Sequence, residues 1–182
     1  PELDDALVVF DEGHNLPEKA VSQFASEVDL TRLRWLDRLA PTLQSVSGSL
    51  DIPIAANVPT QARELKSILK DTAQIVWHNM ASQMRSGDGV RRLSEGEIDA
   101  LLAEPLKAAR DRAAELLKVA EELGSELRAR IKDQPENSAK LALHYAALGG
   151  FVPRVSAVHQ TASMLLNSGE ESRTTAKWCS VD

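Results

Sequence analysis

Aromatic residues, cysteine and glycine are scarce in this sequence of 182 residues. Phe, Trp and Tyr make up 4% of the chain, so a buried core has to be built from Leu, Ala, Val and Ile. Cys179 is the one cysteine, which excludes an internal disulfide and any metal site made of cysteines alone. Because only nine Gly and eight Pro interrupt an Ala- and Leu-rich sequence, we expect helices. A reducing, cytoplasmic setting fits this composition best.

Membrane and targeting signals are also missing. No apolar run approaches the length needed to span a bilayer, and the first residues contain neither a basic nor an apolar segment of a signal peptide. We therefore expect no membrane partner. The net charge of −6 argues against a surface that is cationic throughout, as in many isolated nucleic-acid-binding modules. Any contact with nucleic acid must be local.

Positive charge is concentrated in one stretch. Residues 59–93 carry six bases and three acids, a net charge of +3, whereas residues 1–19 carry six acids and one base, a net charge of −5. Arg63, Lys66 and Lys70 have the spacing i, i+3, i+7, which places them on one face of a helix. The candidates for contact with a single-stranded DNA backbone are Arg63, Lys66, Lys70, Arg85, Arg91 and Arg92. The alternative is an ordinary solvated helix face.

Two strand-like runs enclose a long helical region. Leu7-Val8-Val9-Phe10 is continuously apolar and ends abruptly in Asp11-Glu12-Gly13, which is typical of a buried parallel strand entering a loop. Asn15 and Pro17 then suit the start of a helix. Residues 174–181 are strand-like again. The pattern predicts a helical domain (17–170) inserted between two strands (1–16 and 171–182) of another domain.

Apolar residues three and four positions apart predict the individual helices. We expect Pro41 to kink or end the first long one and residues 47–58 to form a loop. A helix beginning near Pro59 should end before the breaker sequence at residues 86–89. The capping pattern of Ser94 and Glu97 should start the next, with a buried stripe from Ile98 to Ile131.

Breaks and core residues complete this prediction. We expect Pro105 to divide the helix that follows Ser94, and Gly149-Gly150 to kink the last helix near its middle. The three tryptophans, Trp35, Trp77 and Trp178, have apolar neighbours at helix or strand spacing, so core packing is favoured over base stacking. The three histidines after residue 70 lack acidic or thiol partners at the spacing of metal ligands.

Asp11 and Glu12 are the residues with the clearest chemistry. An apolar strand that ends in two acids fixes the carboxylates at the carboxyl edge of a parallel sheet, where α/β folds bind their ligands. Asp11 is suited to hold Mg²⁺ beside nucleotide phosphates, and Glu12 to orient or deprotonate the attacking water. A strand end with solvated acids is the alternative.

The sequence Asp11-Glu12-Gly13-His14-Asn15-Leu16-Pro17-Glu18 resembles the D-E-x-H box of superfamily 2 helicases, in the branch related to DinG and XPD. Gly13 stands where many relatives have Ala. Members of this branch insert a helical arch domain directly after the box, and Ala176-Lys177-Trp178 resembles their re-entry strand. The resemblance implies a mainly α arch-like helical bundle, flanked by short strands of a RecA-like α/β motor.

The resemblance also implies a function. The full-length parent would be an ATP-dependent 5′→3′ DNA helicase in genome maintenance and repair, with Asp11 as Mg-ATP ligand and Glu12 as catalytic carboxylate. His14 would couple the nucleotide state to the neighbouring motor domain. The arch would shape the path of single-stranded or forked DNA and contact the motor and the iron–sulfur domain. The family's 4Fe-4S cluster would have its ligands outside this chain, which has one cysteine.

The layout of the sequence indicates an internal fragment. It begins with Pro1 and contains no Gly-x-x-x-x-Gly-Lys-[Ser/Thr] phosphate loop, so we expect the chain by itself not to hydrolyse ATP. Two alternatives remain open. One is a free-standing helical interaction protein in which Asp11-Glu12 is accidental, and the other is the insertion of a different superfamily 2 ATPase.

Overall fold

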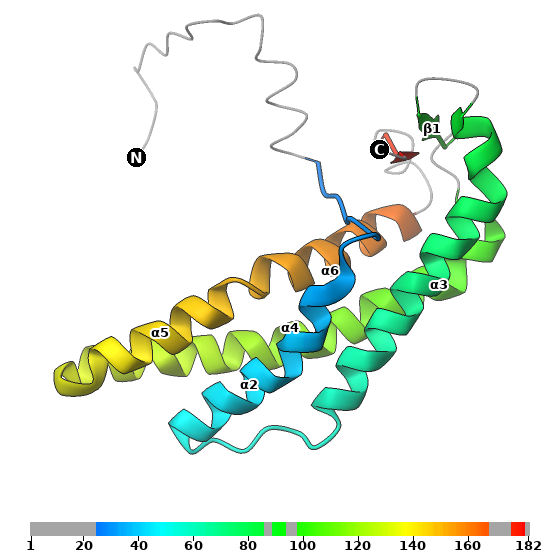
Figure 1. The fold of residues 1–182 in the computed structure, drawn as a ribbon. Coiled ribbons are helices and arrows are strands. Elements are labelled where there is room, and N and C mark those ends of the chain that lie inside the picture. The colour runs from blue at the N-terminus through cyan, green and yellow to red at the C-terminus, as the bar shows by residue number, and fades with distance from the viewer. Residues whose placement is uncertain (1–24, 86–88, 94–97, 168–175, 181–182) are drawn as a thin grey trace, which may run out of the picture.

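A computed structural model describes residues 25–85, 89–93, 98–167 and 176–180, most of them helical (Figure 1). In chain order the elements are the 3-10 turn η2 (Leu33–Trp35), α2 (Leu36–Leu50), α3 (Val58–Arg85), β1 (Val90–Arg92), α4 (Ala100–Asp133), the 3-10 turn η4 (Pro135–Asn137), α5 (Ser138–Gly149), α6 (Val152–Leu166) and β2 (Trp178–Ser180). The prediction of a mainly α fold is confirmed. The predicted strand Leu7–Phe10 lies outside the described residues.

Helix α4 is the axis of the bundle. It has 34 residues, which corresponds to a length of about 50 Å. It contacts α2, α3, α5 and α6, and α5 and α6 follow one another along it (Figure 1). Its buried positions recur every three or four residues, at Leu102, Leu106, Ala109, Ala113, Leu116, Ala120, Leu123 and Leu127. The predicted stripe is therefore confirmed between Leu102 and Leu127, with Leu123 added to it, whereas its two ends, Ile98 and Ile131, are only half-buried.

The start of α4 differs from the prediction. The helix begins at Ala100, and residues 98 and 99 are not helical, so a start at Ser94 is wrong. Asp99 is the N-cap: its backbone is extended and its carboxylate accepts a hydrogen bond from the backbone N–H of Leu101 at 3.0 Å. Asp is among the strongest capping residues, and its carboxylate also favours the positive end of the helix dipole.

Neither internal proline interrupts its helix. Pro41 lies inside α2 and Pro105 inside α4, so a helix end at Pro41 and a division at Pro105 are wrong, and a kink at Pro41 stays a prediction. Each ring removes only one backbone hydrogen bond near the start of a long helix. Buried leucines lie on both sides of each proline, Leu39 and Leu43 in α2 and Leu102 and Leu106 in α4. The packing of these side chains holds each helix together across its proline.

Helix α2 also extends further than predicted. Residues 47–50 are helical, so the expected loop 47–58 is reduced to residues 51–57. Asp51 adopts the left-handed conformation (φ 55°) at the helix end, and the backbone N–H of Ile52 donates to the carbonyl of Ser47 at 3.1 Å. This is the Schellman type of helix end, usually formed with glycine. Asp51 therefore ends the helix, and the prediction that Gly48 would break it is wrong.

The last helical region breaks where predicted, between α5 and α6 at Gly150-Phe151. By length and composition alone, Pro135–Leu166 is apolar enough to cross a membrane, but this segment is divided between α5 and α6. Leu141 and Leu148 of α5 and Val155 and Val158 of α6 pack into the core. Leu143 and Tyr145 of α5 and Met164 of α6 are exposed, so the outer side of this layer carries apolar side chains.

A two-stranded antiparallel sheet lies at one end of the bundle (Figure 1). The strand predicted within residues 174–181 is present as β2, and its partner β1 was not predicted. The register pairs Val90 with Ser180, Arg91 with Cys179 and Arg92 with Trp178. The two strands lie about 90 residues apart in the sequence, so the sheet joins the end of the described chain to the segment after α3.

Gly124 gives a test of packing between α4 and α5. It lies inside α4, where a Cβ would meet Leu148 Cδ2 at 3.5 Å, an ordinary van der Waals distance. We expect Gly124→Ala to raise the free energy of unfolding by about 0.5–1 kcal/mol, because alanine loses less backbone entropy in a helix. Urea titration would measure this. Gly48→Ala, with open space around its Cβ, is the control, and a loss of stability in Gly124→Ala alone would show that α5 packs more tightly than described.

Candidate nucleic-acid interface

The residues of the predicted ATP site lie outside the described residues. Asp11, Glu12 and His14 precede the first described position, so their roles stay predictions. Within the described part of the chain, no group of three or more His, Cys, Asp and Glu side chains could hold a metal ion. An iron–sulfur cluster needs about four cysteine ligands. Cys179 is the one cysteine, so this chain's own residues do not fit that cluster.

Arg63, Lys66 and Lys70 lie on one side of α3, as their spacing predicted. Lys66 identifies this side as the one toward α2, because its Nζ lies 2.5 and 2.6 Å from the carboxylate oxygens of Asp37. Arg63 folds back along α3, with Nε donating to the carbonyl of Pro59 at 3.3 Å. Lys70, one turn beyond Lys66, is exposed. Arg63 and Lys70 are therefore exposed cations, whereas Lys66 is paired with Asp37 of α2.

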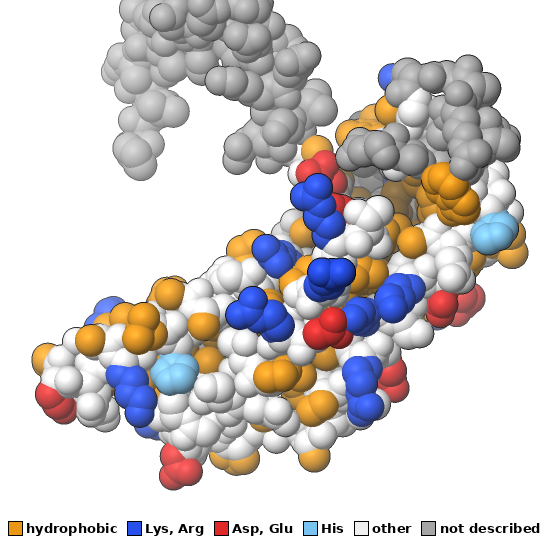
Figure 2. All heavy atoms as spheres, in the orientation of Figure 1, with side chains coloured by type: hydrophobic (Ala, Val, Ile, Leu, Met, Phe, Trp, Pro, Cys, Tyr) orange, Lys and Arg blue, Asp and Glu red, His pale blue; other side chains and the backbone are white. Residues whose placement is uncertain are grey.

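The turn η2 and helix α2 each add one arginine that the sequence prediction missed. Arg34 and Arg38 are exposed and four residues apart, on the side opposite the buried leucines. We call the surface formed by Arg34, Arg38, Arg63, Lys66 and Lys70 the cationic face. Figure 2 shows Lys and Arg side chains gathered over α2 and α3. The helical spacing of Arg34 and Arg38 was visible in the sequence, but their position beside α3 depends on how the helices pack.

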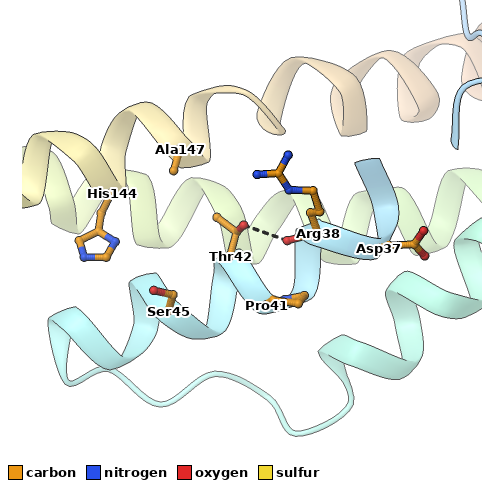
Figure 3. A pocket seen from close by; sticks show the side chains of 7 residues that line it. All are labelled: Asp37, Arg38, Pro41, Thr42, Ser45, His144 and Ala147. Carbon is orange, nitrogen blue, oxygen red and sulfur yellow. Dashed lines mark hydrogen bonds between the residues drawn. The ribbon is translucent and has the colours of Figure 1, made fainter. Parts of the chain in front are cut away.

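A shallow groove of about 310 Å³ lies on the surface where α2 and α5 meet. Its lining is Asp37, Arg38, Pro41, Thr42 and Ser45 of α2 with His144 and Ala147 of α5. In Figure 3 the Arg38 side chain extends from α2 toward α5, and His144 lies across from Ser45. The Thr42 hydroxyl donates to the carbonyl of Arg38 at 2.8 Å. Guanidinium and hydroxyl groups are donors that bind phosphate oxygens, so Arg38, beside the carboxylate of Asp37, extends the cationic face toward α5.

Acidic side chains of α3 and α4 are used in contacts between these two helices. Arg112 Nε lies 2.9 Å from Glu64 Oε2, and its Nη1 lies 2.7 Å from Glu115 Oε2. The amide of Gln61 also donates to Glu115 Oε2 at 2.7 Å. The hydrogen bond and charge of Glu115, followed by the charge of Glu64, raise the pKa of Arg112 above its ordinary value. Glu64 is thereby directed to α4, away from the cationic face.

Arg91 and Arg92 do not join the predicted basic cluster. They lie on β1, beyond the end of α3. Lys70 and Arg85 are 15 residues apart in this helix, which separates them by about 22 Å along its axis. Side chains of successive strand residues point to opposite faces, so the two arginines also differ in direction. Arg92 is exposed and Arg91 is half-buried. The candidates therefore form two separate groups.

Lys177 fixes the sheet to the end of α6. It is 5% exposed, and its Nζ donates to the carbonyls of Leu165 at 3.0 Å and Asn167 at 2.6 Å. These carbonyls belong to the last turn of α6 and to its C-cap residue, where a cation is favoured by the helix dipole. Burial lowers the pKa of the Lys177 ammonium below its ordinary value. Lys177 thus holds the start of β2 against α6.

The prediction that all three tryptophans pack in the core is wrong for two of them. Trp35 is half-buried against the main core, but Trp77 is 46% exposed and Trp178 is 41% exposed. The helix and strand spacing identified their apolar neighbours correctly. Ile75 and Val76 beside Trp77, and Cys179 beside Trp178, pack on a second apolar cluster around Leu102 and Leu106. The spacing did not show that the two indoles project away from this cluster.

Comparison with known proteins finds a relative among DNA helicases. No protein-family model matches the chain, and no solved structure matches it. The chain is 27% identical over 135 residues to the ATP-dependent DNA helicase DinG of Photobacterium profundum. It is similar to a region of a DinG helicase. The match covers 73% of this chain and 19% of that helicase, so the chain spans about a fifth of its relative's length.

Proposed function

We propose that this chain is a segment of an ATP-dependent DNA helicase of the DinG type, called here the parent helicase. The observation that carries the proposal is the likeness to a DinG helicase over 135 residues. Two further features support it. The box at Asp11–His14 resembles that of a helicase ATP site, and the described residues are mainly helical, as that resemblance implies.

In this proposal the helical domain has a mechanical role. Residues 17–170 form the arch, and their cationic face guides the phosphate backbone of a single DNA strand. A positively charged groove that follows the backbone is the usual solution for binding single strands without sequence preference. The contact of α4 with α2, α3, α5 and α6 gives the face a rigid support. Asp11 and Glu12, before the arch, belong to the ATP site of the motor.

The cationic face can be tested by reversing two of its charges. Arg38 and Lys70 are exposed and lie on different helices, α2 and α3. We expect Arg38→Glu with Lys70→Glu to weaken binding of single-stranded DNA roughly tenfold, equally for all sequences. The dependence of log affinity on log salt should become shallower by about 0.7 for each lost phosphate contact. Fluorescence anisotropy of labelled oligonucleotides at several salt concentrations would measure both effects.

A matched control uses cations on another surface. Arg128 and Lys132 are exposed near the end of α4, and reversing both changes the net charge by the same amount. The proposal requires this double variant to bind single-stranded DNA with an affinity within about twofold of the unmodified protein, because the reversed charges lie outside the DNA path. Equal losses in the two double variants would show a general charge effect and contradict a defined path over α2 and α3. Lys66 is unsuited to the test, since its substitution also breaks the ion pair with Asp37.

A further inference from the structure

The two exposed tryptophans lie at the same end of the bundle. Val76, next to Trp77 on α3, and Cys179, next to Trp178 on β2, pack against one apolar cluster that includes Leu102 and Leu106. The chain has only three Trp, one Tyr and three Phe, so it exposes much of two of its seven aromatic side chains here. Indoles are among the largest contributors of binding surface, both for apolar contact and for stacking.

The sheet places Trp178 beside a cation. Residues directly opposite one another in an antiparallel pair have their side chains on the same face, so Trp178 and Arg92 share a face. This is the outer face, because the Arg91–Cys179 pair lies on the other and Cys179 packs on the apolar cluster. Arg92 is exposed and Trp178 is 41% exposed. A guanidinium next to an indole favours a flat, electron-rich ligand and the negative charge attached to it.

Trp77 continues the basic row of α3. Arg63, Lys70 and Trp77 are spaced by seven residues, which returns each to nearly the same side of the helix. Trp77 lies about 10 Å beyond Lys70 along the axis. A strand whose phosphates follow the cationic face would therefore reach an exposed indole next. Figure 2 shows hydrophobic side chains exposed at this end, beyond the Lys and Arg side chains over α2 and α3.

We infer that Trp77 and Trp178, with Arg92, form a stacking site for unpaired nucleobases, called here the indole platform. The inference rests on the proposed function and extends it from the phosphates to the bases. Nucleic-acid bases fit this surface better than an apolar protein partner does, because β1 contributes Arg92 to the outer face and neither strand contains a carboxylate.

The experiment compares two ligands that share a backbone. The full 182-residue chain is titrated against an oligothymidylate and against an abasic oligomer of equal length, each with a fluorescent label. Stacking of one base contributes about 1–3 kcal/mol, which corresponds to roughly 5- to 150-fold in affinity. We expect the oligothymidylate to bind more tightly by a factor in this range. It should also quench the indole emission of the unmodified protein, whereas the abasic oligomer should not.

Variants identify the side chains responsible. Trp77→Leu with Trp178→Leu should remove the preference for bases and leave abasic binding and its salt dependence unchanged. Trp77→Phe with Trp178→Phe should restore part of the preference, because phenyl rings also stack. Trp35→Phe is the control at the half-buried indole, and it should keep the preference. Far-UV circular dichroism confirms that each variant retains its helices.

The outcomes separate the two proposals. The indole platform would be overturned if the protein bound the two oligomers with equal affinity. It would also be overturned if the leucine variant lost affinity for both oligomers by the same factor. Either result leaves the proposed phosphate path in place. Binding of neither oligomer by the folded chain would overturn both the platform and a nucleic-acid role for the helical domain. Tighter binding of the oligothymidylate, lost with the leucine variant and partly regained with the phenylalanine variant, supports both.

Discussion

Glu12→Gln in the parent helicase is expected to lower ATP turnover by about 10²–10⁴-fold while leaving ATP binding intact. A side chain that takes the proton of the attacking water contributes an acceleration of about this size. Glutamine keeps the shape of the side chain but cannot accept that proton. The expected loss is therefore in kcat, with little change in the affinity for the nucleotide. Steady-state ATP hydrolysis and equilibrium binding of a labelled nucleotide would measure the two quantities.

Two further changes in the same region sharpen this prediction. Glu18→Gln removes an acid that lies outside the box and has no role in the proposed ATP site, so it should leave turnover within about twofold. His14→Ala should retain much of the ATP hydrolysis and lose DNA unwinding, since the resemblance gives His14 a coupling role. A Glu12→Gln protein with normal ATP turnover would contradict the assignment of Asp11–His14 to a helicase ATP site and favour an accidental acid pair.

The same assay distinguishes the parent helicase from the isolated segment. The 182-residue sequence contains no phosphate loop, so we expect no ATP turnover by it, with or without DNA. Turnover by the segment would contradict its place within a larger motor. The nucleic-acid contacts proposed for α2, α3 and the sheet should remain measurable in the segment, because they rely on surface side chains of the helical domain.

The sequence predicted the helices well because their energetics are local and periodic. Leucine and alanine stripes in α3 and α4 repeat with the period of a helix, and burial of one face follows directly from that pattern. The breaks were harder to predict. Pro41 and Pro105 are strong local signals, yet packing of the leucines around them outweighs one lost hydrogen bond. Asp51 ends α2 in a conformation more common for glycine.

The candidate interface depends on contacts between distant residues, which a single sequence does not encode in its periodicity. Lys66 was placed on the correct side of α3, but its pairing with Asp37 requires α2 to lie alongside. Arg38 and His144, more than 100 residues apart, line one groove only because α2 and α5 pack together. Strand β1 was missed because three residues without alternation carry little signal, and its pairing with β2 comes from the far end of the chain.

Core packing should control whether these distant surfaces stay together, and Leu116 tests this most directly. It is completely buried near the middle of α4, in the apolar cluster to which α2, α3, α5 and α6 also contribute. Leu116→Ala removes three carbon atoms and leaves a cavity where the surrounding helices are held from several sides. We expect the free energy of unfolding to fall by about 2–5 kcal/mol, the usual cost of such a change in a well-packed core.

Leu143→Ala is the matched control, since it makes the same chemical change at a site that is 74% exposed on α5. Its effect should stay within about 0.5 kcal/mol, as for most surface substitutions. Urea titration followed by circular dichroism would measure both variants. A loss below about 1 kcal/mol for Leu116→Ala would mean that α4 is not the axis of one cooperative core, because a loosely packed site collapses around the missing atoms at little cost. In that case α2 and α5 would lose their common support, and the groove between Arg38 and His144 could not hold a fixed DNA path.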